Sequence, residues 1–346
     1  MHNVIAYVVS GTVAASVVTP VNTHTQTAGP GIAIGGGAQS IAITPDSKTV
    51  YVPNGVLNTV TPIRTATNKA GPPIPVGSEP FALVVTPNGR TVYVGNTSLA
   101  SVTPIRVSTN SPLSVIPVGN VPARVVISPN GRFVYTVNAT DNTVTPIRVS
   151  TNTAGSAIPV GNLPNSAAIT PDGKTLYVGN RNDGSVTPIH LQTGTPGPPI
   201  PVGTSPAAIL ITPNGKTAYV SNQDDDTVTP INVASNAALP AIPVGHRPFD
   251  MVVTRNGRTV YVLNSGSDNV TPIRVSTNTP RTAIPVPHQP FTLALSPDGK
   301  TLYVTGGANL LTPIRISTNH PQTPVLVGTS PSAIAFAIVR HRRTKA

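Results

Sequence analysis

A tripeptide, Thr-Pro-Ile or Thr-Pro-Val, recurs along this chain at a nearly fixed interval. It begins at Thr19, Thr61, Thr103, Thr145, Thr187, Thr229, Thr271 and Thr312, so the spacing is 42 residues six times and 41 residues once. All eight tyrosines occupy one position of the same repeat, namely Tyr7, Tyr51, Tyr93, Tyr135, Tyr177, Tyr219, Tyr261 and Tyr303. Such a period indicates a repeat architecture, in which each unit buries its apolar face against its neighbours.

Each repeat contains four β-prone segments separated by turn residues. In the unit that begins at Pro164, we predict strands at residues 167–170, 175–178, 185–191 and 200–202. The sequence Pro-Asp-Gly-Lys at 171–174 is suited to a hairpin turn, because glycine tolerates positive φ. Pro188 has no N–H to donate, so we expect it where no ladder donor is required, at a sheet edge or at a bulge. Four antiparallel strands every 42 residues match one blade of a β-propeller.

The two ends of the chain hold complementary parts of one blade. The chain opens at a second strand, around Tyr7, and ends with a lone first strand at 332–338. Seven complete blades begin near Gln39, Phe81, Ala123, Asn165, Ala207, Phe249 and Phe291. Pairing the two ends would complete an eighth blade and remove open sheet edges. We therefore predict an all-β, eight-bladed propeller of four-stranded antiparallel blades, with seven blades as the alternative. It forms a single domain over residues 1–339, followed by a basic tail at 340–346.

Composition excludes several other classes of protein. The chain has one glutamate and no cysteine, so a helical bundle, a disulfide framework and a cysteine-ligated metal site are not expected. No apolar run approaches the length of a transmembrane helix. The first 16 residues lack a basic segment followed by an apolar stretch, so no signal peptide is visible. This favours a cytoplasmic protein, with a secreted or envelope protein as the alternative.

The core of the repeat, Pro-Asp-Gly-Lys-Thr-Leu-Tyr-Val-x-Asn, resembles the YVTN family of β-propeller repeat proteins. It stands in full at 171–180, and its Tyr-Val-x-Asn part recurs at 51–54, 93–96, 219–222 and 261–264. Departures occur at 135–138, 303–306 and 7–10. The resemblance covers essentially the whole chain and implies the propeller fold, in a family whose members occur in cell-surface layers and bacterial envelopes. Streptogramin lyases are distantly similar and use His, Glu and magnesium, but that motif cannot be mapped here because the only glutamate is Glu79.

Positions where the repeats disagree indicate where a function could have been added. A proline precedes the first strand in seven blades, and Ala38 takes its place in blade 1. Two residues later, six blades have a small uncharged residue, and the other two have Arg124 and Asp250. One residue earlier stand three of the five phenylalanines, Phe81, Phe249 and Phe291. The loops into these strands add Glu79, His246, Arg247 and His288.

These residues predict a small-molecule pocket at the mouth of the central channel. We call this face the top; it carries the connections from outer to first strand and from second to third strand. Phe81, Phe249, Phe291, Glu79 and Arg247 are the predicted ligand-binding residues, because such sites combine apolar walls with a few orienting polar groups.

An enzyme is one alternative: a lyase, cyclase or hydrolase in which His246 or His288 acts as general base, Asp250 orients it and Arg124 holds an anion. A structural envelope protein is another alternative, with Arg124 and Asp250 merely paired across the channel mouth.

No cofactor is predicted, although clustered carboxylates leave magnesium or calcium as an alternative. Asp224, Asp225 and Asp226 are consecutive, and Asp183 and Asp268 stand in comparable loops. The cluster lacks the alternating spacing of a calcium loop, and turns explain single aspartates. The histidines have no zinc-type spacing, and neither GxSxG nor a phosphate-binding glycine loop before a helix occurs.

The formal net charge is +11, and much of it follows the repeat. Seven basic residues occupy the turn after the first strand: Lys48, Arg90, Arg132, Lys174, Lys216, Arg258 and Lys300. Five follow the Thr-Pro-Ile tripeptide: Arg64, Arg106, Arg148, Arg274 and Arg315. We favour the interpretation that these residues keep the protein soluble, with weak polyanion binding as the alternative. The expected partner is a small molecule or a protein, and the oligomeric state is left open.

Overall fold

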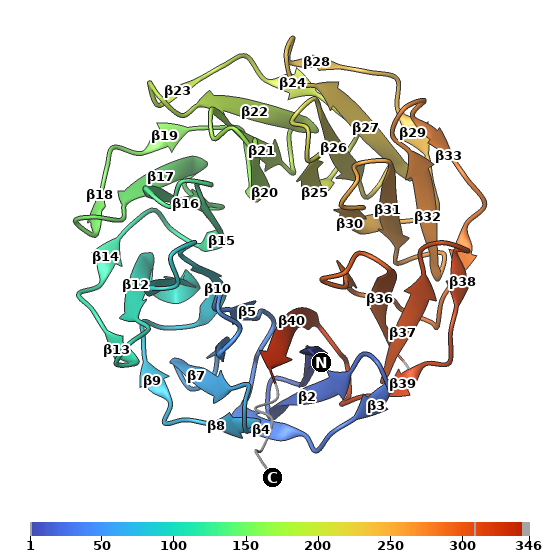
Figure 1. The fold of residues 1–346 in the computed structure, drawn as a ribbon. Helices are drawn as coiled ribbons and strands as arrows, with labels where there is room; N and C mark the ends of the chain where they lie inside the picture. Colours follow the sequence, from blue (N-terminus) through green and yellow to red (C-terminus); the bar gives the residue numbers. More distant parts are fainter. Residues whose placement is uncertain (1, 308, 341–346) are drawn as a thin grey trace.

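The computed structural model describes residues 2–307 and 309–340. The described chain forms a ring of eight antiparallel sheets, shown in Figure 1, so the predicted eight-bladed propeller is confirmed. Blades 1 to 7 follow the chain from β5 to β39, and blade 8 joins the two ends of the chain. In the described part of the chain, no helix is long and apolar enough to span a membrane.

Every blade has three main strands, and the first of these lines the channel (Figure 1). The first strands, from blade 1 to blade 8, are β5 (Ala42–Ile43), β10 (Pro80–Val85), β15 (Pro122–Ile127), β20 (Pro164–Ile169), β25 (Pro206–Ile211), β30 (Pro248–Val253), β35 (Leu293–Leu295) and β40 (Ala333–Arg340). The second strands are β6 (Thr49–Asn54), β11 (Thr91–Asn96), β16 (Phe133–Asn138), β21 (Thr175–Asn180), β26 (Thr217–Asn222), β31 (Thr259–Asn264), β36 (Thr301–Gly306) and β1 (His2–Gly11). The third strands are β7 (Thr59–Arg64), β12 (Ser101–Arg106), β17 (Thr143–Arg148), β22 (Ser185–His190), β27 (Thr227–Asn232), β32 (Asn269–Arg274), β37 (Leu310–Arg315) and β2 (Ser16–Asn22).

The fourth, outer strand is divided into two short pieces, where the sequence predicted one. The pieces nearer the bottom are β8 (Lys69–Ala70), β13 (Ser111–Pro112), β18 (Thr153–Ala154), β23 (Thr195–Pro196), β28 (Ala237–Ala238), β33 (Thr279–Pro280), β38 (His320–Pro321) and β3 (Thr27–Ala28). Those nearer the top are β9 (Ile74–Pro75), β14 (Ile116–Pro117), β19 (Ile158–Pro159), β24 (Ile200–Pro201), β29 (Ile242–Pro243), β34 (Ile284–Pro285), β39 (Val325–Leu326) and β4 (Ile32–Gly35). A short 3-10 helix, η1 (Thr97–Leu99), follows β11.

The division of the outer strand follows from the proline of the repeated tripeptide. Pro188 pairs with Tyr177 of β21 on one side, and on the other side its carbonyl accepts from the Gly197 N–H at 2.7 Å. Gly197 lies between β23 and β24, where the outer strand is interrupted. Because Pro188 offers no N–H to this side, the ladder breaks there. The prediction that Pro188 needs a position without a ladder donor is confirmed.

Among the described residues, the repeated tyrosine fastens seven of the eight blades to the next. The Tyr51 hydroxyl donates to Asn110 Oδ1 of the following blade at 2.6 Å. The same contact joins Tyr7 to Asn68, Tyr93 to Asn152, Tyr177 to Asn236, Tyr219 to Asn278 and Tyr261 to Asn319, and Gln26 donates to Tyr303. Burial raises the pKa of these phenols, to about 12 for Tyr51, so they remain protonated donors. Eight apolar clusters between neighbouring blades form the core.

The asparagine of Tyr-Val-x-Asn is also structural. Asn222 is fully buried, and its Nδ2 donates to Thr227 at 2.9 Å and to Thr229, the threonine of the tripeptide, at 2.8 Å. Gly203 lies so close that a Cβ there would meet Asn222 at 2.7 Å, which explains the glycine of Ile-Pro-Val-Gly. The motif therefore encodes contacts within and between blades.

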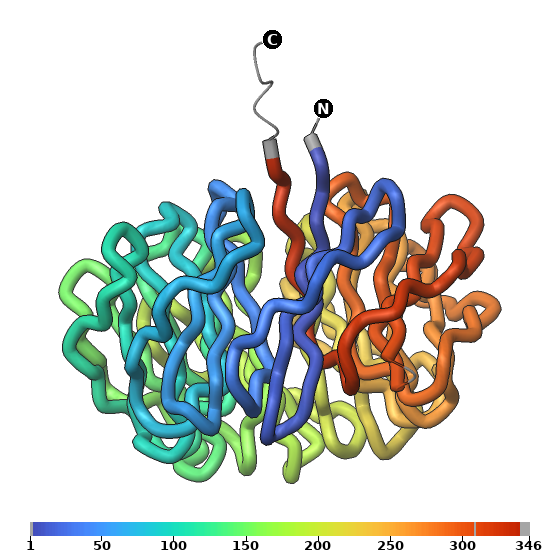
Figure 2. The backbone as a smooth tube through the Cα atoms, turned by 90° about the horizontal axis from the view of Figure 1, so that it is seen from below, coloured from blue at the N-terminus to red at the C-terminus, as the bar shows by residue number. Residues whose placement is uncertain are grey.

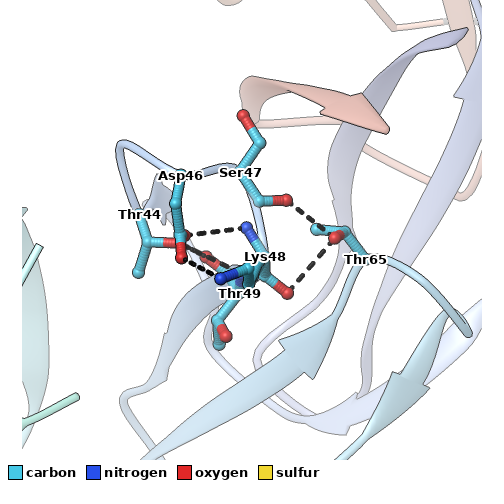
Figure 3. A network of polar contacts seen from close by, with 6 residues as sticks. All are labelled: Thr44, Asp46, Ser47, Lys48, Thr49 and Thr65. Atoms are coloured by element: carbon cyan, nitrogen blue, oxygen red, sulfur yellow. Dashed lines mark hydrogen bonds and ion pairs between the residues drawn. The ribbon is translucent and has the colours of Figure 1, made fainter. Parts of the chain in front are cut away.

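The turn after each first strand forms the bottom face and projects the repeated basic residue into solvent. In blade 1, shown in Figure 3, Thr44 Oγ1 and the Lys48 N–H both donate to Asp46 Oδ1, at 2.7 and 3.1 Å. Thr65 donates to the Ser47 carbonyl at 2.7 Å and holds the turn against the third strand. These contacts fix the turn backbone and leave the Lys48 side chain exposed.

The predicted closure by the two chain ends is confirmed. β40 pairs antiparallel with β1, from His2 opposite Arg340 to Val9 opposite Ala333. Figure 2 shows these two strands side by side, both reaching the same edge of the ring, which is the bottom face. The predicted basic tail lies outside the described residues after Arg340.

Candidate functional site

A cavity of about 450 Å³ lies at the top mouth of the central channel, and residues of all eight blades line it. Most of the lining residues stand at the start of a first strand, where the sequence analysis placed the differences between repeats. Phe81, Arg124, Phe249, Asp250 and Phe291 all contribute to this one cavity.

The local backbone turns Phe81 and Phe249 into the mouth, and Phe291 stands at the same position of blade 7. In blades 2 and 6, the strand register shifts between the proline and the second residue after it, which leaves Phe81 and Phe249 in a bulge. A bulge re-aims a side chain out of the regular alternation. The rings are 40%, 36% and 43% exposed for Phe81, Phe249 and Phe291, a large exposure for aromatic side chains. Phe249 and Phe291 contact each other with centroids 5.5 Å apart, and Phe81 stands across the channel, four blades from Phe249 and three from Phe291.

Asp250 is half-buried and ties blade 6 to blade 7. Its Oδ2 accepts from Thr292 Oγ1 at 2.8 Å and from the Leu293 N–H at 3.3 Å, and its Oδ1 accepts from the Met251 N–H at 2.9 Å. Burial raises the pKa of Asp250, although these hydrogen bonds and the charge of Arg124 oppose the shift. The carboxyl is thus held in place while its ionised form is disfavoured.

Arg124 is exposed in the cavity wall on blade 3. Within residues 2–307 and 309–340, its guanidinium makes no ion pair, so Arg124 and Asp250 are not paired across the mouth. A guanidinium without a partner beside apolar rings is a ready site for a carboxylate or phosphate group.

His246 and His288 lie away from this cavity. Their side chains are 76% and 74% exposed, and their Nδ1 atoms contact Asp226 at 2.5 Å and Asp268 at 2.7 Å. The structure therefore does not bring either histidine to Asp250, as the enzyme alternative required. The N–H of Arg247 lowers the pKa of Asp226 below its usual range, and the contact with His246 adds to this effect, although burial opposes it.

The aspartates that suggested a cation site connect loops of the top face. Asp183 accepts from both nitrogens of Asn162, Asp225 from Thr204, Asp224 from Ser205 and Asp268 from the Gln289 N–H. Asp183, Asp224 and Asp225 thus cap the loop that leads into their own blade, whereas Asp268 caps the loop that leads into the next blade. Among the described residues, no group of three or more His, Asp or Glu side chains is placed to hold a metal.

Glu79 and Arg247 occupy the rim rather than the cavity itself. Both have positive φ, 53° and 54°, directly before a proline. The Glu79 carboxylate accepts from Ser98 at 2.5 Å. Arg247 lines a second hollow of about 600 Å³ over blades 6 to 8, which shares Gln39, Phe291 and Ser332 with the channel mouth. The two hollows are therefore continuous along the phenylalanine side of the ring.

Two polar residues of the cavity were missed by the sequence analysis. Arg181 and Gln223 enter it from the loops after β21 and β26, and Arg181 Nη2 donates to Gln223 Oε1 at 3.4 Å. They directly follow the asparagine of Tyr-Val-x-Asn. Aligning that position would have shown Arg181 as an exception, since Thr97, Ala139 and Ser265 stand there in other blades.

Comparison with known proteins supports the fold and indicates a family. The family model described as "Lactonase, 7-bladed beta-propeller" matches residues 106–198 and 190–283, which together span more than half of the chain. The described residues form eight blades, one more than that description states. A search of curated proteins finds no match.

Several solved structures share the fold at low sequence identity. Hydrazine synthase of Kuenenia stuttgartiensis is similar at 23% identity and a TM-score of 0.67, over 81% of this chain and 96% of that one. The dihydro-heme d1 dehydrogenase NirN in complex with DHE is similar at 16% identity and a TM-score of 0.81, over 96% of this chain and 74% of that one. AztD of Citrobacter koseri is similar at 11% identity and a TM-score of 0.74, over 99% of this chain and 100% of that one. At these identities the similarity shows the fold alone.

Proposed function

The chain belongs to the lactonase β-propeller family, and we propose that it binds a small organic acid with an apolar body at the top mouth of its channel. The observation that carries this proposal is the meeting of three half-exposed phenylalanines with the unpaired Arg124 in one cavity. The rings would bury the apolar body, and the guanidinium would bind the acid group. We also propose that the repeats are of the YVTN type.

The size of the cavity is consistent with a ligand of this kind. About 450 Å³ lies within the range of small-molecule sites, which are mostly apolar and contain a few polar groups. The rigid ring fixes the geometry, because all eight first strands are held on both sides by inter-blade contacts. NirN, a structural neighbour, was solved in complex with DHE, so a propeller of this shape can accept a ligand.

Ligand-observed NMR with a panel of aromatic and aliphatic carboxylic acids would test the proposal. Arg124→Ala and Phe249→Ala restore residues that other blades have at the same positions, such as Ala82 and Ala123, so the fold should tolerate them. We expect each variant to weaken acid binding by about tenfold or more.

Arg90→Ala on the bottom face is the matched control for the loss of one positive charge, and it should leave acid binding unchanged. A mouth that binds no acid of the panel, or equal binding by the wild type and both top-face variants, would refute the proposal.

Hydrolysis of a lactone is a second candidate function, favoured by Asp250. A carboxyl with a raised pKa keeps its proton to a higher pH than usual and can pass it to a leaving alkoxide, and Arg124 could hold the acid that forms. Acid release from a panel of lactones, measured by pH-stat, would test this. Activity retained in both Asp250→Asn and Arg124→Ala would exclude these residues from catalysis.

A further inference from the structure

Charge is segregated between the two faces of the ring. Two positions of the repeat, in the turn after the first strand and directly after the Thr-Pro-Ile tripeptide, place twelve basic residues at the bottom turns. Lys69, Arg255 and Arg281 also lie there. The acidic residues of these turns are only Asp46, Asp172 and Asp298. The remaining eight acidic residues of the chain lie at the top. The bottom face is therefore strongly positive, and this charge follows from the topology of the blade.

Blade 6 departs from the repeat on this face by two additional arginines. Arg281 stands where other blades have glycine, leucine or glutamine, as at Gly155, Leu239 and Gln322. Arg255 replaces the proline found at this turn in blades 1 to 5 and 7, and its stem packs over Gly299 as Pro213 packs over Gly257. Blade 6 thus adds two charges to Arg258 and Arg274, which the repeat already supplies.

Three of these arginines line one groove. A hollow of about 800 Å³ lies between the bottom turns of blades 5, 6 and 7, and Arg258, Arg274 and Arg281 form its charged wall. Its other polar lining includes hydroxyls such as those of Ser276 and Thr318, and no carboxylate lines it in the described part of the chain. At the back of the groove, Tyr261 donates to Asn319 at 2.6 Å, and the Arg281 charge partly offsets the rise that burial causes in the pKa of Tyr261.

No ion pair neutralises this wall. Within the described residues, Arg258, Arg274 and Arg281 are exposed and have no carboxylate within 4.0 Å, in contrast to Lys48 and Lys174 in blades 1 and 4, which contact Asp46 and Asp172. The turn of blade 6 has Asn256 in place of that aspartate. Asparagine also stands at this position in blades 2, 3 and 5, so the two additional arginines are what set blade 6 apart.

We propose that this groove is a binding site for a phosphate-bearing anion, either a terminal phosphate group or a short polyphosphate. A guanidinium can donate two hydrogen bonds to one phosphate, and three such groups without counter-charges match an anion that carries more than one negative charge. A terminal phosphate carries about −1.5 to −2 at neutral pH, whereas a phosphodiester carries one charge spread along a strand. The site is on the face opposite to the channel mouth and does not depend on the function proposed there.

Inorganic tripolyphosphate is the probe for a calorimetric titration of the full chain at constant ionic strength. Arg281→Leu places the residue of Leu113 and Leu239 in blade 6, and Arg274→Asn places the residue of Asn232 there, so both substitutions already occur within this fold. We expect one saturable site in the wild type and a loss of affinity of about tenfold or more in each variant. Arg106→Asn in blade 2 is the matched control, because it removes the same charge from the same repeat position and should change the affinity less than about twofold.

The pattern across variants decides the proposal. Equal weakening by Arg106→Asn and Arg274→Asn would show a diffuse positive face and would overturn it, as would unchanged affinity in Arg281→Leu. An oligodeoxynucleotide titrated in parallel tests the alternative partner, a phosphodiester strand. Tighter binding of that strand, with equal sensitivity to all three substitutions, would also count against a localised site. Circular dichroism of each variant ensures that a loss of binding is not a loss of fold.

Discussion

The tyrosine that joins neighbouring blades lacks its partner at one place in the ring, and restoring it gives a direct test of what the repeat encodes. Tyr135 is buried, but the position that is asparagine in most other blades is Gly194 in blade 4, and the Tyr135 hydroxyl has no hydrogen bond among the described residues. Gly194 has the same left-handed backbone, φ 70°, as Asn152 at 53°. A Cβ at Gly194 would meet only Ile158 Cδ1, at 3.9 Å. We therefore predict that Gly194→Asn supplies the missing contact without a steric clash.

The expected gain can be worked from two terms. A hydrogen bond of this kind contributes about 0.5–1.5 kcal/mol net. Replacing glycine at a site whose backbone the new residue accepts adds up to about 1 kcal/mol by reducing the entropy of the unfolded chain, and the left-handed conformation offsets part of this for asparagine. We expect Gly194→Asn to raise the free energy of unfolding by about 1 kcal/mol.

A double-mutant cycle measured by urea denaturation separates the hydrogen bond from the backbone effect. Tyr135→Phe should change stability little in the wild type, and it should cost about 1 kcal/mol in the Gly194→Asn background. The converse control is Asn236→Gly, which removes the partner of Tyr177 and should cost a similar amount. A coupling energy within about 0.3 kcal/mol of zero would refute the idea that the tyrosine acts through this contact.

Three further predictions follow from particular contacts. Gly306→Asn alone should destabilise blade 7, because Pro287 stands where other blades have the glycine that lies against the asparagine. Adding Pro287→Gly should recover stability, because the new asparagine can then donate to the Thr312 hydroxyl, which has no partner among the described residues. No recovery of the double variant in urea denaturation would count against this pairing. Gly161→Ala should lower stability by about 1–3 kcal/mol, since its Cβ would lie 2.6 Å from Asn180. Gly31→Ala is the control, because Gly31 has no positive φ and its Cβ would meet only Val17 Cβ at 3.8 Å; equal losses in the two variants would exclude the steric reason. The raised pKa of Asp250 means that the folded state holds this proton more tightly than the unfolded chain does. The free energy of unfolding of the wild type should therefore fall, relative to that of Asp250→Asn, as pH rises from the usual pKa of an aspartate toward the raised pKa. A difference between the two proteins that does not change with pH would contradict the raised pKa.

Much of the fold could be predicted because the repeat reports the same environment eight times. Tyr51 and its counterparts must face one kind of interior, and the 42-residue spacing together with the incomplete ends at Tyr7 and 332–338 defines the number of blades and their closure. The split outer strand was missed, because its pieces, such as Thr195–Pro196 and Ile200–Pro201, are too short to carry a pattern. The gap between them arises in the neighbouring strand, where Pro188 lacks an N–H.

The candidate site was predictable only where the backbone decides a side chain's direction. Phe81, Phe249, Arg124 and Asp250 stand at or next to a strand bulge that is repeated around the channel, so their position in the repeat implied their place in space. His246 is in a loop whose partner, Asp226, is 20 residues away on the preceding blade. Nothing in the local sequence distinguishes Asp226 from Asp250 as the partner of that histidine.

In a repeat this regular, the residues that recur in every blade and the residues that bind a ligand must be different residues. The tyrosine, asparagine, threonine and glycine of each unit are occupied by contacts inside the ring, so they are not free to bind a ligand. A residue that departs from the repeat in one blade is not needed to build that blade, because the other blades are built without it. Replacing Arg124 or Arg281 with the residue of a neighbouring blade should therefore weaken binding at its own face by about tenfold or more and leave both the other face and the stability unchanged. If either substitution instead destabilised the ring by as much as Asn236→Gly, the departure would be structural, and the reasoning that places function at these positions would fail.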